Sequence, residues 1–416
     1  MPTPLTDKHI ILGVTGSIAC YKAASLASRL TQAGAKVDVI LTHAATKFVS
    51  PITFQSVTGR PAYTDADLWG AQAHVLHVGL ARTVDLMVIA PATANTMAKL
   101  AHGQADNLLM LTALSAGLGP ESPPLLIAPA MDGEMYTHPA TQENVRLLRQ
   151  YGASIVGPAE GRLASGMVAR GRMAEPEELA GMIRLLLTRK GPLRGRRVVV
   201  TAGGTREAID PVRMLTNRSS GKQGVALVQA ALDAGADVTL IAPPLLIPTP
   251  TGITRIEANS AREMQAAVLE TCRQADVLLM VAAVSDFRPV VSAAQKIKKE
   301  EGIPPIRLER NPDILQAVHE QKQQLGRPYV VVGFAAETEN LLQNAQGKLE
   351  RKGLDMIVAN DVSASDAGFS VDTNRVTLID ARAGREPLPL LSKEEVAERI
   401  IARVMELLPD SLPPGT

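Results

Sequence analysis

Long apolar runs that do not alternate with polar residues constrain the fold of this chain more than any other feature. Two segments share one order of elements: HIILGV (9–14) leads through TGSIACYK to an Ala- and Leu-rich helical pattern and AGAKVDVILT, and RRVVVTAGG (196–204) leads to GVALVQAALDAGADVTLIAP. Each predicts a strand, a glycine turn, a helix and a second strand, which form a βαβ unit of a parallel sheet. Strands that are apolar throughout are covered on both faces, so we expect α/β domains with doubly wound, mostly parallel sheets.

A second repeated pattern consists of an acidic residue, a buried strand and then small polar residues. It occurs in VDLMVIAPATAN (84–95), in ADVLLMVAAVSD (275–286) and in LDMIVANDVS (354–363). In doubly wound folds, ligands bind beyond the carboxyl ends of the strands. The small polar residues therefore mark the expected positions of the binding sites.

The domain boundary is visible in RKGPLRGRR (189–197), a basic stretch with glycine and proline after the helical pattern EELAGMIRLLL. A chain of 416 residues exceeds what one hydrophobic core usually serves, so two domains are expected. We predict a first domain at 1–188, a linker at 189–195, a second domain at 196–409 and a short tail at 410–416.

The composition excludes several classes of protein. With 43 basic and 42 acidic residues, the chain lacks the charge excess of a protein whose main partner is nucleic acid or an anionic membrane. No apolar stretch approaches the roughly 20 residues that span a bilayer, and the N-terminus lacks a signal-peptide pattern. Cys20 and Cys272 are too few for a disulfide framework, so we expect a cytoplasmic location.

GVTGSIACYK, between the first strand and its helix, offers backbone N–H groups and a helix N-terminus to an anion. The same pattern fits a glycine turn that binds nothing, so this stretch alone leaves both interpretations open. It is neither GxGxxG nor a Walker loop, which disfavours NAD and an ATP-type phosphate site. A second polar cluster, APATANT (90–96), is expected to end the neighbouring strand. Two adjacent clusters favour a cofactor pocket.

GSIACYK, HVGLARTVDLMVIAPATANT, PAMDGEMYTHPATQ and GRMAEP together resemble the flavin-dependent phosphopantothenoylcysteine decarboxylase half of the bifunctional coenzyme A biosynthesis family. The resemblance implies a flavodoxin- or Rossmann-like domain and a catalytic His77. His74 is the competing candidate, and a histidine satisfied in the core is the alternative for either. The residues implied to hold FMN are Gly16, Ser17, Ile18, Thr42, Pro91, Ala92, Thr93 and Asn95.

The chain departs from the family pattern at two residues implied to be catalytic. Asp132 replaces the asparagine whose amide would contact the substrate carboxylate. Two unit charges about 4 Å apart repel by roughly 4 kcal/mol at an effective dielectric near 20. Asp132 would then need a proton or a cation. We predict that Arg170 pairs with Asp132 or with the substrate carboxylate.

The second departure is Ser165, which replaces the cysteine that donates a proton in the family. A thiol with a pKa of about 8.5 can release a proton near neutral pH, whereas an alcohol is a far weaker acid. Neither Cys20 nor Cys272 lies in a segment that could obviously substitute for it.

The second half combines a polar loop, TAGGTREAIDPVRMLTNRSSGKQG (201–224), with KIKK (296–299), NPDI (311–314) and GFAAET (333–338). Alone, the loop also fits a long structural connection and KIKK a solvated charge run. Lys348 and Lys352 have the i,i+4 spacing that puts two side chains on one helix face. Read together, these motifs favour a basic triphosphate pocket.

This combination resembles the Rossmann-like phosphopantothenate–cysteine ligase half of the same family, from about Val198 to Asp372. The resemblance implies that CTP activates a carboxylate as an acyl-cytidylate, with Asn217, Arg213 and Lys296 as catalytic residues. It also implies that Asp286 helps to hold a divalent cation such as Mg²⁺. The residues implied to bind CTP are Met280, Val281, Ala282, Asp286, Lys296, Asn311, Pro312, Asp313, Ile314, Phe334, Lys348 and Lys352.

The sequence thus predicts an enzyme that joins 4′-phosphopantothenate to cysteine and then decarboxylates the product to 4′-phosphopantetheine. Two alternatives stay open: an active ligase with an impaired decarboxylase, and a flavin-binding regulatory subunit. Small-molecule substrates are the expected partners. The family also implies trimers of the flavin domain, dimers of the ligase domain and a dodecamer.

Overall fold

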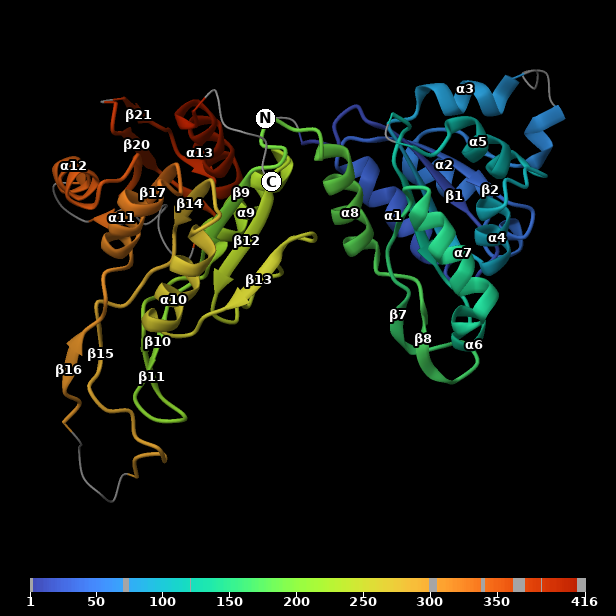
Figure 1. Ribbon diagram of the computed structural model, residues 1–416. Helices are drawn as coiled ribbons and strands as arrows, with labels where there is room; N and C mark the ends of the chain where they lie inside the picture. Colours follow the sequence, from blue (N-terminus) through green and yellow to red (C-terminus); the bar gives the residue numbers. More distant parts are fainter. Residues whose placement is uncertain are drawn as a thin grey trace. The chain divides into compact units, whose positions relative to one another are not determined.

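A computed structural model describes residues 3–69, 75–119, 121–298, 305–337, 341–361, 371–382 and 384–409. The chain divides between Leu187 and Thr188 into two compact units, which are described separately (Figure 1). His74, Lys299 and Thr338, which belong to predicted sites, lie outside the described residues.

The first unit alternates strands with helices. Its strands are β1 (His9–Val14), β2 (Lys36–Leu41), β3 (Ala62–Tyr63), β4 (Leu86–Ala92), β5 (Leu125–Pro129), β6 (Ser154–Ile155), β7 (Ala159–Arg162) and β8 (Val168–Arg172). Its helices are α1 (Cys20–Gln32), η1 (Ala45–Lys47), α2 (Pro51–Thr58), η2 (Asp65–Trp69), α3 (Leu76–Thr83), α4 (Ala94–Ala101), α5 (Leu108–Ala116), α6 (Gly133–Thr137), α7 (Pro139–Gln150) and α8 (Pro176–Thr188).

The main sheet of the first unit has the order β3-β2-β1-β4-β5-β6, and all its strand pairs are parallel. Alternate residues of β1 enter two different cores. Ile10 and Leu12 pack with α1, α2 and α8, whereas Ile11 packs with α3, α4, α5 and α7. Burial on both faces explains why the strand sequences do not alternate.

The second unit contains the remaining elements. Its strands are β9 (Arg197–Thr201), β10 (Arg206–Ala208), β11 (Met214–Thr216), β12 (Asp237–Ala242), β13 (Thr254–Glu257), β14 (Val277–Met280), β15 (Phe287–Pro289), β16 (Leu308–Arg310), β17 (Val330–Glu337), β18 (Met356–Asp361), β19 (Thr373–Asn374), β20 (Val376–Asp380), β21 (Arg385–Pro387) and β22 (Leu391–Ser392). Its helices are α9 (Lys222–Asp233), α10 (Ala261–Cys272), α11 (Ile314–Leu325), α12 (Leu341–Lys352) and α13 (Lys393–Leu407).

The main sheet of the second unit has the order β13-β12-β9-β14-β17-β18-β20-β21. The strands from β13 to β18 are parallel, and β20 and β21 are antiparallel. The six strands from β13 to β18 follow the same order as the six strands of the first unit. In each sheet, successive strands are added on one side of the first strand (β1 or β9) and then, from β4 or β14 on, on its other side. The hairpins β10–β11 and β15–β16 extend away from this sheet (Figure 1). The predicted fold class, two doubly wound and mostly parallel α/β domains, is confirmed.

The acidic residues that precede the buried strands have a structural role. Asp85, before β4, accepts a hydrogen bond from the backbone N–H of His9 at 2.8 Å. Asp276, before β14, accepts one from Arg197 N at 2.8 Å. Asp355, before β18, accepts from Val331 N at 2.7 Å. Each carboxylate therefore satisfies an amide at the start of a neighbouring strand, the first residue of β1 and β9 and the second of β17.

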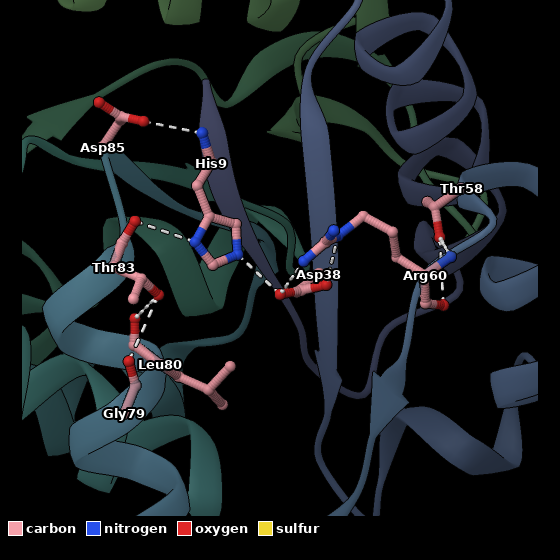
Figure 2. A network of polar contacts seen from close by, with 8 residues as sticks. All are labelled: His9, Asp38, Thr58, Arg60, Gly79, Leu80, Thr83 and Asp85. Carbon is pink, nitrogen blue, oxygen red and sulfur yellow. Dashed lines mark hydrogen bonds and ion pairs between the residues drawn. The ribbon is translucent and has the colours of Figure 1, made fainter. Parts of the chain in front are cut away.

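A buried polar network near the amino ends of β1 and β2 holds the end of α3 (Figure 2). His9 Nε2 lies 2.6 Å from Asp38 Oδ2, and Arg60 donates to the same carboxylate from Nε at 2.7 Å and Nη2 at 3.0 Å. The other ring nitrogen of His9 lies 2.9 Å from the carbonyl oxygen of Thr83, the last residue of α3. The network therefore fixes the helix that carries His77.

Two pKa values shift in opposite directions within this network. The hydrogen bond with Asp38 raises the pKa of His9, and burial opposes this rise only in part. Burial alone would raise the pKa of Asp38, but hydrogen bonds from His9 and Arg60 outweigh burial and lower it. Both shifts favour the imidazolium–carboxylate form of the pair.

Candidate active sites

The neighbouring strands β1 and β4, at the centre of the first sheet, are also joined by the hydroxyl group of one threonine. Thr15, directly after β1, donates from Oγ1 to Pro91 O at 2.8 Å, and its Oγ1 accepts from Thr93 N at 3.1 Å. Ala92, at the end of β4, accepts a further bond from Ala130 N at 3.0 Å. The carboxyl ends of β1, β4 and β5 thus form one continuous floor, where a ligand of this fold binds.

The loop above this floor leaves backbone donors available. Among the described residues, no hydrogen bond uses the N–H groups of Gly16 or Ile18. No side chain caps α1. A Cβ on Gly16 would lie 2.5 Å from the Cβ of Ala44, so glycine permits the close approach of this loop to the one after β2. Free N–H groups at a helix N-terminus suit a phosphate, which fits the predicted FMN.

The other predicted flavin-binding residues flank this loop. Thr42 follows β2 and donates from its backbone N to Val14 O at 3.0 Å. Thr93 caps α4, whereas Asn95 in its first turn is exposed. Ile18 is 64% exposed, so an apolar side chain also stands free next to the open amides.

His77 lies in the first turn of α3, where its ring is half-buried. Its Nδ1 is buried and has no hydrogen-bond partner within the described ranges, which stop at 69 and resume at 75. A histidine satisfied in the core would have a partner there. Within the described part of the single chain, no hydrogen bond joins His77 to Thr93 or Asp132.

Asp132 and Ser165 meet, although 33 residues separate them. Ser165 Oγ donates to Asp132 Oδ2 at 2.6 Å, and Glu134 N donates to Oδ1 at 3.3 Å, which makes Asp132 the N-cap of α6. Ser165 lies at the tip of the β7–β8 hairpin. A backbone bond from Met131 N to Gly171 O at 3.0 Å ties this hairpin to the end of β5.

The predicted pairing of Arg170 with Asp132 is wrong, whereas its pairing with the substrate carboxylate stays a prediction. Arg170 Nε donates to Pro158 O at 3.0 Å, and its guanidinium lies 5.7 Å from the centre of the Tyr136 ring. Neighbouring side chains of a strand alternate in direction. A Cβ on Gly133 would lie 2.7 Å from Ala169 Cβ, so Ala169 faces the start of α6 and Arg170 points elsewhere.

Neither cysteine can serve as the missing acid. Cys20 is buried, its Sγ donates to Thr15 O at 3.3 Å, and burial raises its pKa. Cys272 is buried on α10 of the other unit, where burial raises its pKa to about 12. The carboxyl–hydroxyl pair is thus the remaining candidate at this position.

The second unit uses a threonine at the same point of its sheet. Thr201, the last residue of β9, accepts at Oγ1 from Val281 N and from Ala282 N, both at 3.0 Å. It donates to the sulfur of buried Met280 at 3.4 Å. The N–H groups of Val281 and Ala282 are therefore occupied, and a nucleotide could meet these two residues only through their carbonyl groups or side chains.

A second cluster surrounds the segment after β14. Asn217 Nδ2 lies 3.2 Å from the carbonyl oxygens of Ala283 and Val284. Asn311 Nδ2 donates to Ser285 O at 2.8 Å, and Asn311 N donates to Asp286 O at 2.8 Å. The buried Ser285 hydroxyl has no partner among the described residues. Asp286 is exposed.

Arg213 and Lys296 are connected through Asp210, which the sequence analysis did not single out. Arg213 donates to Asp210 Oδ2 from Nε at 2.9 Å, and its Nη2 donates to Ile297 O at 3.1 Å. The hydrogen bond from Arg213 holds the pKa of Asp210 well below its usual range. Asp210 also accepts from Ile297 N at 3.3 Å and so fixes the segment that carries exposed Lys296.

The remaining predicted CTP residues gather where β17 meets α11 and α12. Lys348 Nζ donates to Phe334 O at 2.8 Å, and Lys352 pairs with Asp313. Asp313 caps α11 directly after Pro312. Burial would raise the pKa of Asp313, but the hydrogen bonds from Lys352 and Gln316 N and the charges of Lys352 and Lys348 together outweigh burial and lower the pKa. Ile314 is 3% exposed and packs in the core, so its side chain cannot reach a ligand.

Two absences hold for the part of the chain that the structure describes. No group of three or more His, Cys, Asp or Glu side chains could bind a metal ion. No helix there is long and apolar enough to cross a membrane.

Two sequence families match this chain. The Flavoprotein family model matches residues 1–188, and that of the DNA/pantothenate metabolism flavoprotein C-terminal domain matches residues 193–408. Together with the repeated doubly wound fold, these matches define the class: a two-domain flavoprotein.

Relatives match nearly the whole length. The Coenzyme A biosynthesis bifunctional protein CoaBC of Bacillus subtilis (strain 168) is 43% identical over 406 residues, 97% of this chain and 98% of the relative. That of Mycobacterium tuberculosis (strain H37Rv) is 44% identical over 413 residues, 96% and 97% of the two chains. A crystal structure of the C-terminal domain of such a protein is 37% identical, with a TM-score of 0.45, over 53% of this chain and 100% of that one. The chain belongs to the bifunctional coenzyme A biosynthesis protein family, which confirms the resemblance.

Proposed function

We propose that the chain catalyses two consecutive steps of coenzyme A biosynthesis. The second unit joins 4′-phosphopantothenate to cysteine at the expense of CTP, and the first unit decarboxylates the product to 4′-phosphopantetheine. Family membership supports this proposal. The observation that carries it is the gathering of predicted site residues at the carboxyl edge of each sheet, beside Thr15 in one unit and Thr201 in the other.

In the ligase half, the carboxylate of 4′-phosphopantothenate attacks the α-phosphate of CTP. The P–O bond to pyrophosphate breaks, and an acyl-cytidylate forms. The cysteine amine then displaces CMP. Lys296, Lys348 and Lys352 stabilise the negative charge that builds on the phosphates, and the Asn217 amide orients the activated acyl group. Arg213, held by Asp210, positions the segment with Lys296.

A divalent cation fits this half only together with the nucleotide. Asp286 is one exposed carboxylate, and the described residues offer no three-ligand cluster. Mg²⁺ is commonly bound by one or two carboxylates plus substrate phosphates. We therefore assign Asp286 to a cation that arrives with CTP. Removing the cation with EDTA should abolish pyrophosphate release, and an Asp286→Asn variant should need more Mg²⁺ for half-maximal activity.

In the decarboxylase half, bound FMN would supply the acceptor and later the donor of a hydride. The N–H groups of Gly16, Ser17 and Ile18 bind its phosphate. Asp132 and Ser165 face the substrate carboxylate. His77 completes the site as a group that holds or moves a proton at its unpartnered Nδ1.

We also propose that the protein acts as a homo-oligomer. The unpartnered Nδ1 of His77 and the exposed side chains of Ile18 and Tyr21 (64% and 65% exposed) support a flavin site that a second copy of the chain completes. The molar mass of the flavin-loaded protein in solution tests this point, and a monomer would contradict it. The cytoplasmic location stays a prediction.

One assay separates the proposal from its two alternatives. Purified protein of known flavin content is supplied with 4′-phosphopantothenate, cysteine, CTP and Mg²⁺, and both pyrophosphate and CO₂ are measured. Equal release of the two is the expected result. Pyrophosphate without CO₂ would identify a ligase with an impaired decarboxylase. Release of neither would favour a regulatory flavoprotein.

A further inference from the structure

The bond between Asp132 and Ser165 leaves the carboxylate with hydrogen-bond donors but with no cation. Ser165 Oγ and Glu134 N are its donors. The titratable or charged side chains on α6, β7, β8 and at the start of α7 are those of Glu134, Tyr136, His138, Glu160, Arg162, Arg170 and Arg172.

None of these side chains neutralises Asp132. Arg170 donates to Pro158 O, and Arg172 lies 3.3 Å from Glu175 Oε1. His138 Nδ1 accepts from Ala140 N at 3.2 Å. Within the described residues, no ion pair includes Asp132. A substrate carboxylate placed here therefore meets a second carboxylate.

Two carboxylates that share one site disfavour the ionisation of both, because like charges favour the protonated form of one of them. The binding of the substrate therefore draws one proton from solvent into the pair. With Asp132 protonated, its O–H can donate to the substrate carboxylate, as the amide of an asparagine would.

We propose that Asp132 takes up a proton when the substrate carboxylate binds, and that Asp132 delivers this same proton to the substrate carbon once CO₂ has left. This inference rests on the proposed decarboxylase function and deepens it. One ionisable residue thereby meets both needs of the site, the grip on the carboxylate and the supply of the proton.

The atoms balance over the cycle. The flavin activity first takes a hydride from the carbon that bears the thiol, and the thiol proton leaves, so that a thioaldehyde forms. Loss of CO₂ then breaks the C–C bond, and its electron pair moves into the C=S group to give an enethiolate. The O–H bond of Asp132 then breaks and a C–H bond forms at the carbon that lost CO₂. The hydride that the flavin activity supplies reduces the resulting thioaldehyde to a thiolate, which takes back the proton that the thiol lost in the oxidation. Net decarboxylation of a carboxylate consumes one proton, which is the proton taken up at binding.

Ser165 acts as a positioning residue. Its hydroxyl, 2.6 Å from Oδ2, holds one carboxyl oxygen, so that the other oxygen can face the substrate. It also holds the tip of the β7–β8 hairpin against the start of α6. The serine need not be an acid, which removes the difficulty that an alcohol cannot replace a thiol in this role.

The first test measures protons at the binding step. FMN-loaded full-length protein is titrated with 4′-phosphopantothenoylserine, in which a hydroxyl replaces the thiol. Calorimetry at pH 7.5 in buffers of different ionisation enthalpy should show uptake of about one proton per site. Between pH 7.0 and 8.5 the affinity should fall by up to about tenfold per pH unit. Asp132→Asn should take up no proton and bind with pH-independent affinity. Glu134→Gln, the matched control, should behave like the unmodified protein.

The second test follows the product from the true substrate. Asp132→Asn should lose formation of the saturated thiol by at least about 100-fold and accumulate the enethiol, which mass spectrometry identifies as two hydrogens lighter. Ser165→Ala should form the saturated thiol roughly tenfold more slowly than the unmodified protein. The double variant Asp132→Asn/Ser165→Cys should recover the saturated thiol without proton uptake at binding.

The possible results separate the two levels of the proposal. Equal proton uptake by Asp132→Asn and the unmodified protein, or no uptake by either, would overturn the proton role of Asp132. Undiminished formation of saturated thiol by Asp132→Asn would do the same. If the flavin-loaded protein neither binds the analogue nor releases CO₂ from the substrate, the decarboxylase function itself is wrong.

Discussion

Replacing Asp38 by asparagine should destabilise the first unit. The Asp38 side chain is 4% exposed and receives two bonds from Arg60 and one from His9. The asparagine side chain would keep the shape but lose the charge, which leaves the guanidinium and the imidazolium without their counter-ion. Removing one partner of a buried ion pair costs about 3–5 kcal/mol. Arg60 is 36% exposed and can regain water. We therefore expect the free energy of unfolding of the first unit to fall by about 2–3 kcal/mol.

The loss should depend on pH in a defined direction. Because the pKa of His9 is raised in the folded state, its contribution is complete below the unfolded value of about 6.5 and disappears as pH rises through the folded pKa. The pKa of Asp38 is lowered, so its contribution is complete above about 3.9 and disappears as pH falls through the folded pKa. The difference in free energy of unfolding between the unmodified protein and Asp38→Asn should be largest between about pH 4 and 6.5. It should become smaller at higher pH.

The assay is calorimetry of the full chain at fixed FMN, with flavin fluorescence to identify the transition of the first unit. For a unit of this size, the loss corresponds to a midpoint shift of roughly 5–10 °C. Asp7→Asn is the control, because the Asp7–Lys36 pair is 77% and 52% exposed and should contribute nothing measurable. The reasoning is refuted if Asp38→Asn unfolds at the same temperature as Asp7→Asn.

Three further substitutions test the two sites. Thr201→Val should raise the KM for CTP and destabilise the second unit by about 2 kcal/mol, because two N–H groups lose their acceptor; Thr201→Ser should not, and equal calorimetric midpoints for the two variants would contradict this. Asp210→Asn should raise the KM for CTP more than it lowers kcat, because the segment at 293–297 loses its anchor; a pure kcat effect in pyrophosphate-release kinetics would point to a direct catalytic role. Gly16→Val should purify with little FMN because its Cβ would lie 2.5 Å from another Cβ, whereas Gly79→Ala, whose new methyl meets no atom within 4 Å, should keep its flavin absorbance.

The sequence was sufficient to predict the strands, the helices between them and the edge of each sheet where ligands bind. Those features follow from local patterns: an apolar run, a glycine turn and a helical period. Thr15, directly after β1, and Thr201, the last residue of β9, also lie at the ends of such apolar runs.

Contacts between distant segments could not be read in this way. No pattern in the sequence indicates that Ser165 meets Asp132, because the meeting depends on how the β7–β8 hairpin lies against α6. The charge of Arg170 favours a pairing with Asp132, yet the alternating direction of side chains along β8 turns Arg170 toward Pro158 O. In the sequence, Asp210 cannot be distinguished from a solvated acidic residue of a polar loop. Only the fold brings the backbone of Ile297 to its carboxylate.

The threonine hydroxyls that link β1 to β4 and β9 to the residues after β14 have a thermodynamic consequence. Thr15 and Thr201 hold the floor of each site in place through bonds within the protein. Such a floor loses little conformational entropy when a ligand arrives, since it is ordered beforehand. Most of the ordering therefore falls on exposed side chains beside the floor, such as those of Ile18 in the first unit and Lys296 in the second. Variation among relatives in such side chains should change affinity through preorganisation, while the floor stays the same.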